Sequence, residues 1–173
     1  MAAGDTSLSI CSDAMILLGA APISSFTEGS DAAQACDRLY PDVRDTLISN
    51  YLWSWSVQKQ QLGRLSTVPV DEWKYAYQLP GDMLSGVIAL FQSSGLGQQP
   101  VRYGWEIYGD QIYTNFEEVF VDYQASVAES RMPNYFVRLL RTAVASELAF
   151  VITDQVSKAD YFRALAYDSQ ADS

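Results

Sequence analysis

The chain contains no histidine, only two cysteines and only three lysines among its 173 residues. Without imidazole it lacks the commonest general base and metal ligand, and serine or cysteine mechanisms that need imidazole are excluded. Cys11 and Cys36 are 25 positions apart and form neither a zinc motif nor a disulfide framework. We expect them to be small buried apolar side chains, with a single disulfide as the alternative.

Positive charge is also scarce. The net charge is −10, from 21 acidic and 11 basic residues, and no basic run occurs. Sequence-specific binding of nucleic acids needs clustered lysine and arginine, so it is not expected. A Walker phosphate loop is excluded because Gly-Lys-Ser and Gly-Lys-Thr are both absent.

Apolar runs fall well short of the roughly 20 residues that cross a bilayer, and the N-terminus has no secretory-signal pattern. We therefore expect a soluble protein without a membrane partner.

What the chain does contain is typical of a globular protein. Hydrophobic residues make up 49% and charged residues 18% of the sequence. Its length suits one domain, or one body with a small satellite. Aromatic residues reach 13%, which favours strands and contact surfaces.

Two helices are predicted in the N-terminal third. The first covers residues 7–18 and is followed by Gly19, a left-handed stop. Its predicted apolar stripe is Ile10, Ala14, Leu17 and Leu18. The second begins after the N-cap Ser30 and continues through Pro41, where a kink is expected. Its stripe is Ala33, Cys36, Tyr40, Val43, Leu47 and Tyr51.

The linking segments also carry apolar side chains. Ile23 and Phe26, in the non-helical link that holds Pro22, are expected to enter the core. The aromatic residues Trp53 and Trp55 follow the second helix and are also expected to close the core.

Strands are predicted from Trp73 onward, because the apolar period changes from 3.6 to 2. The segments with strand character are 73–79, 87–91, 101–107, 111–113 and 119–123, and Gly109-Asp110 reads as a two-residue hairpin turn. Helical spacing returns after Pro133 and again from about Ser157. This pattern predicts an α+β fold, in which about four helices form a bundle with a small antiparallel β-sheet of four or five strands inserted.

The predicted organisation has three parts. Residues 1–66 supply the N-terminal helices of the body, residues 67–127 the inserted sheet region, and residues 128–173 the helices that complete the body. The last segment, from about Ser157 to the C-terminus, is only weakly apolar and is expected to fray or to become ordered on a partner.

Carboxylates are the only catalytic candidates, and none forms a convincing set. Glu117 and Glu118 are neighbours on a strand and point to opposite faces. The remaining candidates lie on the polar side of a helix or flank turns: Asp37, Asp42, Asp45, Asp71, Glu72 and Asp82. We predict no catalytic, cofactor-binding or metal-binding residue and no enzyme activity. A carboxylate- or metal-dependent hydrolase stays an alternative.

Several motifs occur in an order that resembles a family of phage proteins. They are residues 17–23, 25–30, 33–36 and 40–45, the pair Trp53 and Trp55, and residues 73–82, 105–115 and 136–153. The chain resembles the phage head–tail adaptors, which include tail tubular protein A and related head-completion connectors. Residues 8–168 carry the likeness. The chain departs from the family at its C-terminus, where many members of the family continue into a longer arm. Its signature residues are Gly19, Pro22, Phe26, Tyr40, Arg44, Trp53, Trp55, Trp73, Tyr77 and Pro80.

The resemblance implies a structural virion protein made in the bacterial cytoplasm. It implies a homo-oligomeric ring, usually of twelve copies, beneath the portal at the head–tail junction, with a tail or stopper protein below. Packaged double-stranded DNA passes through such a ring without sequence-specific binding, and an acidic lumen lowers its adhesion. Residues of the last helix are then candidates for portal contact: Tyr161, Phe162, Leu165 and Tyr167.

Two other roles stay open beside the hydrolase. One is a tail-tube or stopper subunit, in the layer below the adaptor. The other is an intracellular binding module that forms no ring.

Overall fold

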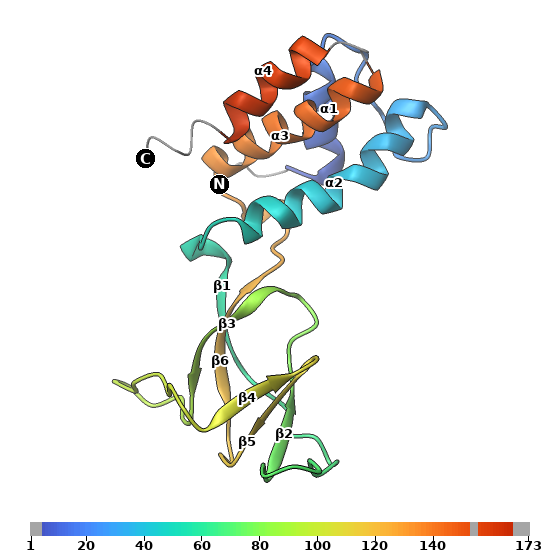
Figure 1. Cartoon of the computed structure of the whole chain (residues 1–173). Coiled ribbons are helices and arrows are strands. Elements are labelled where there is room, and N and C mark those ends of the chain that lie inside the picture. The colour runs from blue at the N-terminus through green and yellow to red at the C-terminus, as the bar shows by residue number, and fades with distance from the viewer. Residues whose placement is uncertain (1–4, 153–155, 168–173) are drawn as a thin grey trace. The chain divides into compact units, whose positions relative to one another are not determined.

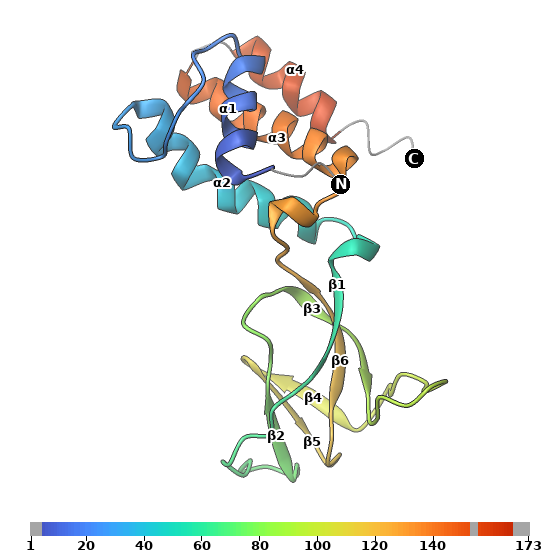
Figure 2. The same ribbon diagram turned by 180° about the vertical axis from the view of Figure 1, so that it is seen from behind.

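The computed structural model describes residues 5–152 and 156–167 and divides the chain into two compact units. The helical unit comprises Met1–Asn50 and Val127–Ser173, and the sheet unit comprises Tyr51–Ser126. Figures 1 and 2 show both units from opposite sides. The fold class is α+β, a helical body with an inserted β region, as predicted. Fraying was predicted from about Ser157 onward, and this is wrong for residues 157–167, which form a helix packed against the helix that precedes it. Residues 168–173 lie outside the described residues.

Four helices build the helical unit: α1 (Ser7–Leu17), α2 (Asp31–Ser49), α3 (Asn134–Ile152) and α4 (Val156–Tyr167). The central helix is α3, which packs against each of the other three (Figure 1). Phe136, Leu140 and Ala143 of α3 are fully buried, as are Ile10 of α1 and Ile48 of α2. None of the described helices is both long and apolar enough to cross a membrane.

The helix ends follow the predicted chemistry. Thr6 and Ser9 form a capping box at the start of α1, and Gly19 beyond its end has a φ of 77°, which favours glycine. The Ser30 hydroxyl accepts a hydrogen bond of 3.2 Å from the backbone N–H of Ala33. The predicted N-cap of α2 is therefore confirmed.

The predicted stripe of α2 is buried from Ala33 to Leu47, but two apolar residues of the predicted stripes, Leu17 and Tyr51, are exposed instead. Tyr51 is exposed because α2 ends at Ser49. In α1, Leu17 is 48% exposed and Leu18 is buried in its place. At the end of α3, Phe150 and Val151 are both more than half exposed, whereas the preceding Leu148 and Ala149 are buried. The sequence near these helix ends is apolar on more than one side of the helix, so the spacing of apolar residues does not tell which of them face the core.

The sheet unit contains two three-stranded antiparallel sheets, where one sheet of four or five strands was predicted. One has the strand order β1-β6-β3, and the other β2-β5-β4. The strands are β1 (Val57–Gln61), β2 (Tyr75–Gln78), β3 (Met83–Phe91), β4 (Trp105–Tyr108), β5 (Gln111–Thr114) and β6 (Phe120–Ala125).

The prediction missed β1, which pairs with β6 and belongs to the sheet unit. The sequence of β1, Val-Gln-Lys-Gln-Gln, does not alternate between apolar and polar residues. The strand is therefore stabilised by backbone hydrogen bonds to β6, which lies far along the chain. The predicted boundary at residue 66 is therefore wrong, because the sheet unit begins at Tyr51.

The hairpin between β4 and β5 is confirmed. Tyr108 pairs with Gln111, and the first turn residue, Gly109, has a φ of 61°. The core of the sheet unit lies around Tyr77, Leu90, Ile112 and Val121, which are all at most 1% exposed.

Candidate functional site

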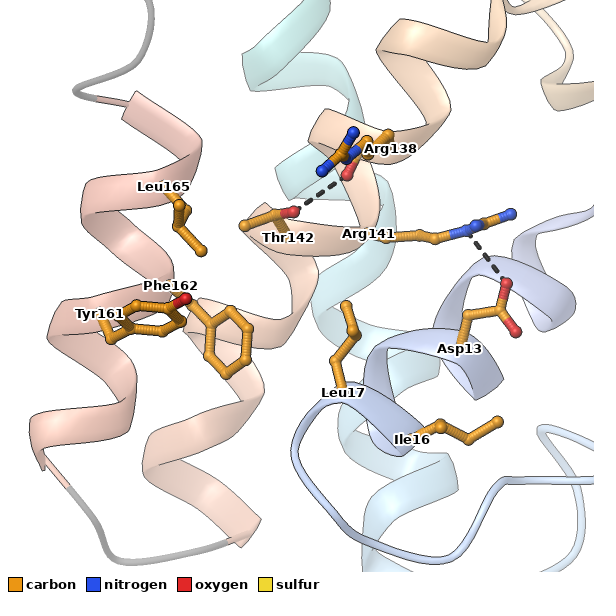
Figure 3. A pocket seen from close by; sticks show the side chains of 9 residues that line it. All are labelled: Asp13, Ile16, Leu17, Arg138, Arg141, Thr142, Tyr161, Phe162 and Leu165. Carbon is orange, nitrogen blue, oxygen red and sulfur yellow. Dashed lines mark hydrogen bonds and ion pairs between the residues drawn. The ribbon is translucent and has the colours of Figure 1, made fainter.

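A groove on the helical unit has a volume of about 560 Å³ (Figure 3). Three helices line it. The lining side chains are Asp13, Ile16 and Leu17 from α1, Arg138, Arg141 and Thr142 from α3, and Tyr161, Phe162 and Leu165 from α4. We call it the α1–α3–α4 groove. A smaller hollow extends it along α3 past Tyr135 and Leu139.

Ionic contacts hold the three helices in place around the groove. Arg141 of α3 lies 3.0 Å from the carboxylate of Asp13 and 3.5 Å from that of Asp5. The Nε–H of Arg141 is not aligned with Asp13, so the shorter contact is an ion pair without hydrogen-bond geometry. Lys158 of α4 donates a hydrogen bond of 3.2 Å to the carbonyl of Leu18, at the negative end of the α1 dipole.

The groove exposes apolar side chains to solvent. Ile16 is 57% exposed and Leu165 is 46% exposed, beside the exposed cation of Arg138. Among the described residues, no carboxylate forms an ion pair with Arg138. Such a surface can bind a partner that offers apolar side chains together with a carboxylate.

The structure brings three of the four predicted portal-contact residues to this groove. Tyr161, Phe162 and Leu165 line it, and the rings of Tyr161 and Phe162 meet edge-on at 5.3 Å. Tyr167 does not line it, and burial raises the pKa of its phenol. Three of the four candidates therefore line one groove, and contact with a portal stays a prediction.

A second hollow, of about 310 Å³, brings three signature residues together: Phe26, Tyr40 and Arg44. They meet Glu129, which precedes α3 in a short 3-10 turn, η2 (Glu129–Arg131). The Tyr40 hydroxyl donates to Glu129 Oε1 at 3.1 Å, and Arg44 Nη1 lies 3.3 Å from the same oxygen. Tyr40 is buried, so desolvation and then the charge of Glu129 raise its pKa well above the usual range.

Sequence reasoning did not identify Glu129. It is 85 residues from Arg44 and 89 from Tyr40 along the chain, and no local pattern links them. The cluster has a structural role, since it fastens α2 to the segment that leads into α3.

The connection between α1 and α2 contains Gly19, Pro22 and a second acidic residue that was not predicted, Glu28. Pro22 is exposed, and Phe26 is only half-buried. The Glu28 carboxylate accepts hydrogen bonds from Ser24 N at 2.8 Å, Ser24 Oγ at 2.7 Å and Ser30 Oγ at 2.7 Å. These bonds, that from Ser30 first, lower the pKa of Glu28 to about 2.

The other five signature residues lie in the sheet unit and line neither hollow: Trp53, Trp55, Trp73, Tyr77 and Pro80. The rings of Trp53 and Trp55 are half-buried at a separation of 6.1 Å. A buried polar network lies beside them. The Gln124 amide donates to the Tyr51 carbonyl at 2.8 Å and to Ser56 Oγ at 3.0 Å.

Tyr77 also has a structural place. Its side chain is 1% exposed, and its hydroxyl donates a hydrogen bond of 2.7 Å to the carbonyl of Phe116. Tyr77 therefore ties β2 to the segment that follows β5.

The two cysteines are buried and free, as predicted, and do not form the disulfide that was the alternative. Their hydrogen bond to each other, together with burial, raises the pKa of the Cys11 thiol. Within residues 5–152 and 156–167, no three acidic or cysteine side chains gather closely enough to hold a metal ion.

No family model matches the chain, and no curated protein has a matching sequence. What the chain does is therefore inferred from its residues and their geometry.

Proposed function

We propose that this protein is a head-to-tail adaptor of a phage virion, a structural subunit without enzyme activity. About twelve copies form a ring under the portal, extend the DNA channel and offer a platform to the tail or stopper protein. The number of copies comes from the resemblance to the adaptor family, and ring closure needs two different complementary surfaces on each subunit.

One observation carries the proposal. Helices from both ends of the chain form one body, and a strand-rich unit is inserted between them. The resemblance to the adaptors implies a helical body with an appended sheet, and its motifs occur in order along the chain. The open α1–α3–α4 groove adds a surface suited to a protein partner.

The charge of the chain agrees with a channel protein. The net charge is −10, and the 11 basic residues form no run in the sequence that would retain DNA phosphates. DNA passing such a ring is repelled by the acidic residues, so it slides with little adhesion.

Portal binding by the full chain tests the proposal. Portal rings from the same genome are mixed with the protein and sedimented, and the fraction that co-sediments is measured. We expect the unaltered chain to co-sediment in a fixed ratio to the portal subunits. A chain that stays in the supernatant at all concentrations contradicts the adaptor role and favours the tail-tube or stopper layer.

A matched pair of variants tests the part played by α4. Tyr161 is 61% exposed, so Tyr161→Ala changes the surface without removing core packing. Tyr103 is 84% exposed in the sheet unit and provides the same substitution as a control. Weaker portal binding in Tyr161→Ala alone supports α4 as a portal contact. Equal binding in both variants removes α4 from the portal interface.

A further inference from the structure

We propose that the α1–α3–α4 groove of one copy binds residues 68–72 of a second copy. We call this segment the valine–acid loop: Val68, Pro69, Val70, Asp71 and Glu72. The groove offers apolar side chains and a cation, and the loop offers apolar side chains and two carboxylates. The inference deepens the proposed function, on which it rests for the closure of these contacts into a ring.

The groove has a positive site beside an apolar floor. The charge of Arg141 is balanced by Asp5 and Asp13, whereas Arg138 is exposed and has no such partner among the described residues. Ile16 and Leu17 of α1 are about half exposed. Figure 3 shows the apolar side chains of α1 and α4 around Thr142, with Arg138 one turn earlier on α3.

The valine–acid loop has the complementary chemistry. Val70 is fully exposed and Val68 is 68% exposed, although valine is usually among the most buried residues. Asp71 and Glu72 are exposed directly after them. The backbone N–H of Trp73 donates to Asp71 Oδ1 at 3.2 Å, which orients this carboxylate. Pro69 restricts the backbone, so the loop loses less conformational entropy on binding.

Other exposed surfaces match the groove less well. The loop around Leu96 exposes this side chain fully but has no carboxylate between residues 93 and 101. On β4, Ile107 and Tyr108 are exposed, but the carboxylate of Glu106 accepts the hydrogen bond of Tyr108. The exposed acids of α2, such as Asp42, have no large apolar side chain exposed within the helix.

The proposed contact joins two different surfaces, so its head-to-tail repetition produces a ring or an open filament. A loop of five residues buries far less than the roughly 800 Å² per partner of a stable interface. One contact alone is therefore weak, and the isolated chain is expected to associate only at high concentration. A ring closes many such contacts at once and gains from their multiplicity.

Cross-linking of two tagged full-length chains tests the contact without any portal. One chain carries Val70→Cys and the other Leu17→Cys, and a short bismaleimide joins thiols that approach each other. The native thiols are 0% exposed and do not interfere. The control pair combines Val70→Cys with Asp31→Cys, an exposed position on α2. We expect about tenfold more mixed dimer from the test pair than from the control pair.

Charge exchange then tests the ionic part. Arg138→Glu in the Leu17→Cys chain should lower cross-linking about tenfold, and Asp71→Arg with Glu72→Arg in the other chain should restore it. Arg102→Glu, an exposed site in the sheet unit, changes the net charge equally and should leave the yield unchanged.

Three results overturn the inference. The first is a test pair that cross-links no more than the control pair. The second is an Arg138→Glu variant whose cross-linking is not restored by Asp71→Arg with Glu72→Arg. The third is preferential cross-linking within one chain that carries both introduced cysteines. The last result identifies the chain's own loop as the occupant. Since portal binding is measured separately, a protein that binds portal rings but fails here refutes only this inference. A protein that cross-links as expected but never binds portals refutes the adaptor function.

The contact also divides the candidate residues of α4. Phe162 and Leu165 then face the neighbouring copy, whereas Tyr161, which is 61% exposed, and Tyr167, which does not line the groove, remain as portal-contact candidates.

Discussion

Replacing Glu129 by alanine should destabilise the helical unit by about 2.5 kcal/mol. The larger part arises at Tyr40, which is 3% exposed and donates its hydroxyl to Glu129 at 3.1 Å. A buried hydroxyl left without its acceptor costs about 2 kcal/mol. Arg44 contributes about 0.5 kcal/mol, because its contact with Glu129 at 3.3 Å is partly solvated and it keeps Asp45 at 2.7 Å.

Urea unfolding can follow the two units separately. All four tryptophans, Trp53, Trp55, Trp73 and Trp105, lie in the sheet unit, so their fluorescence reports on that unit. Circular dichroism at helical wavelengths reports on α1 to α4. With a typical urea dependence for a unit of this size, Glu129→Ala should lower the circular-dichroism midpoint by about 1 M. Asp160→Ala, an exposed change of the same charge on α4, serves as the control.

A thermodynamic cycle isolates the contribution of the tyrosine. Tyr40→Phe should cost about 1 kcal/mol alone and much less in the Glu129→Ala background, because the acceptor is already gone. The cluster does not hold α2 to η2 if Glu129→Ala shifts the midpoint no more than Asp160→Ala does. The same follows if the losses of unfolding free energy caused by Tyr40→Phe and Glu129→Ala are additive in the double variant.

Two further predictions concern the α1–α2 connection and the sheet unit. Folding lowers the pKa of Glu28 to about 2 from an ordinary value of 4.5, so folding favours its charged form. The resulting stabilisation is present above about pH 4.5 and lost as the pH falls toward about 2, and melting temperatures of the wild type and Glu28→Gln should converge over that range. Gln124→Ala should lower the tryptophan-fluorescence midpoint through a cost of about 2 kcal/mol, since Ser56 and the Tyr51 carbonyl lose a buried donor. The exposed Gln92→Ala should not shift it, and equal shifts in both variants would refute the role of the network.

Local signals in the sequence predicted most of the elements correctly. The N-cap Ser30, the stop at Gly19 and the turn at Gly109 are each decided within a few residues, and the structure has all three as expected. The stripe of α2 was predicted well because polar residues clearly separate its faces. In α1, apolar side chains occur on nearly all sides, so the sequence could not tell that Leu18 enters the core and Leu17 lines the groove.

The features that were missed depend on contacts between distant residues. β1 has no apolar alternation and exists through its pairing with β6. Glu129 meets partners more than 80 residues away, so nothing near it in the sequence marks it as an acceptor. The groove itself was not predicted. Tyr161, Phe162 and Leu165 of α4 were named only as candidates for portal contact, and Arg138 and Ile16 enter the groove through helix packing that no single segment encodes.

The mass and symmetry of complexes with portal rings test the central claim most directly. Portal rings and the full chain are mixed, and native mass spectrometry gives the number of chains bound while electron-microscope class averages give the symmetry. The adaptor function predicts a discrete ring stacked on the portal, with one adaptor chain for each portal subunit. A portal whose mass is unchanged by an excess of the protein contradicts the claim.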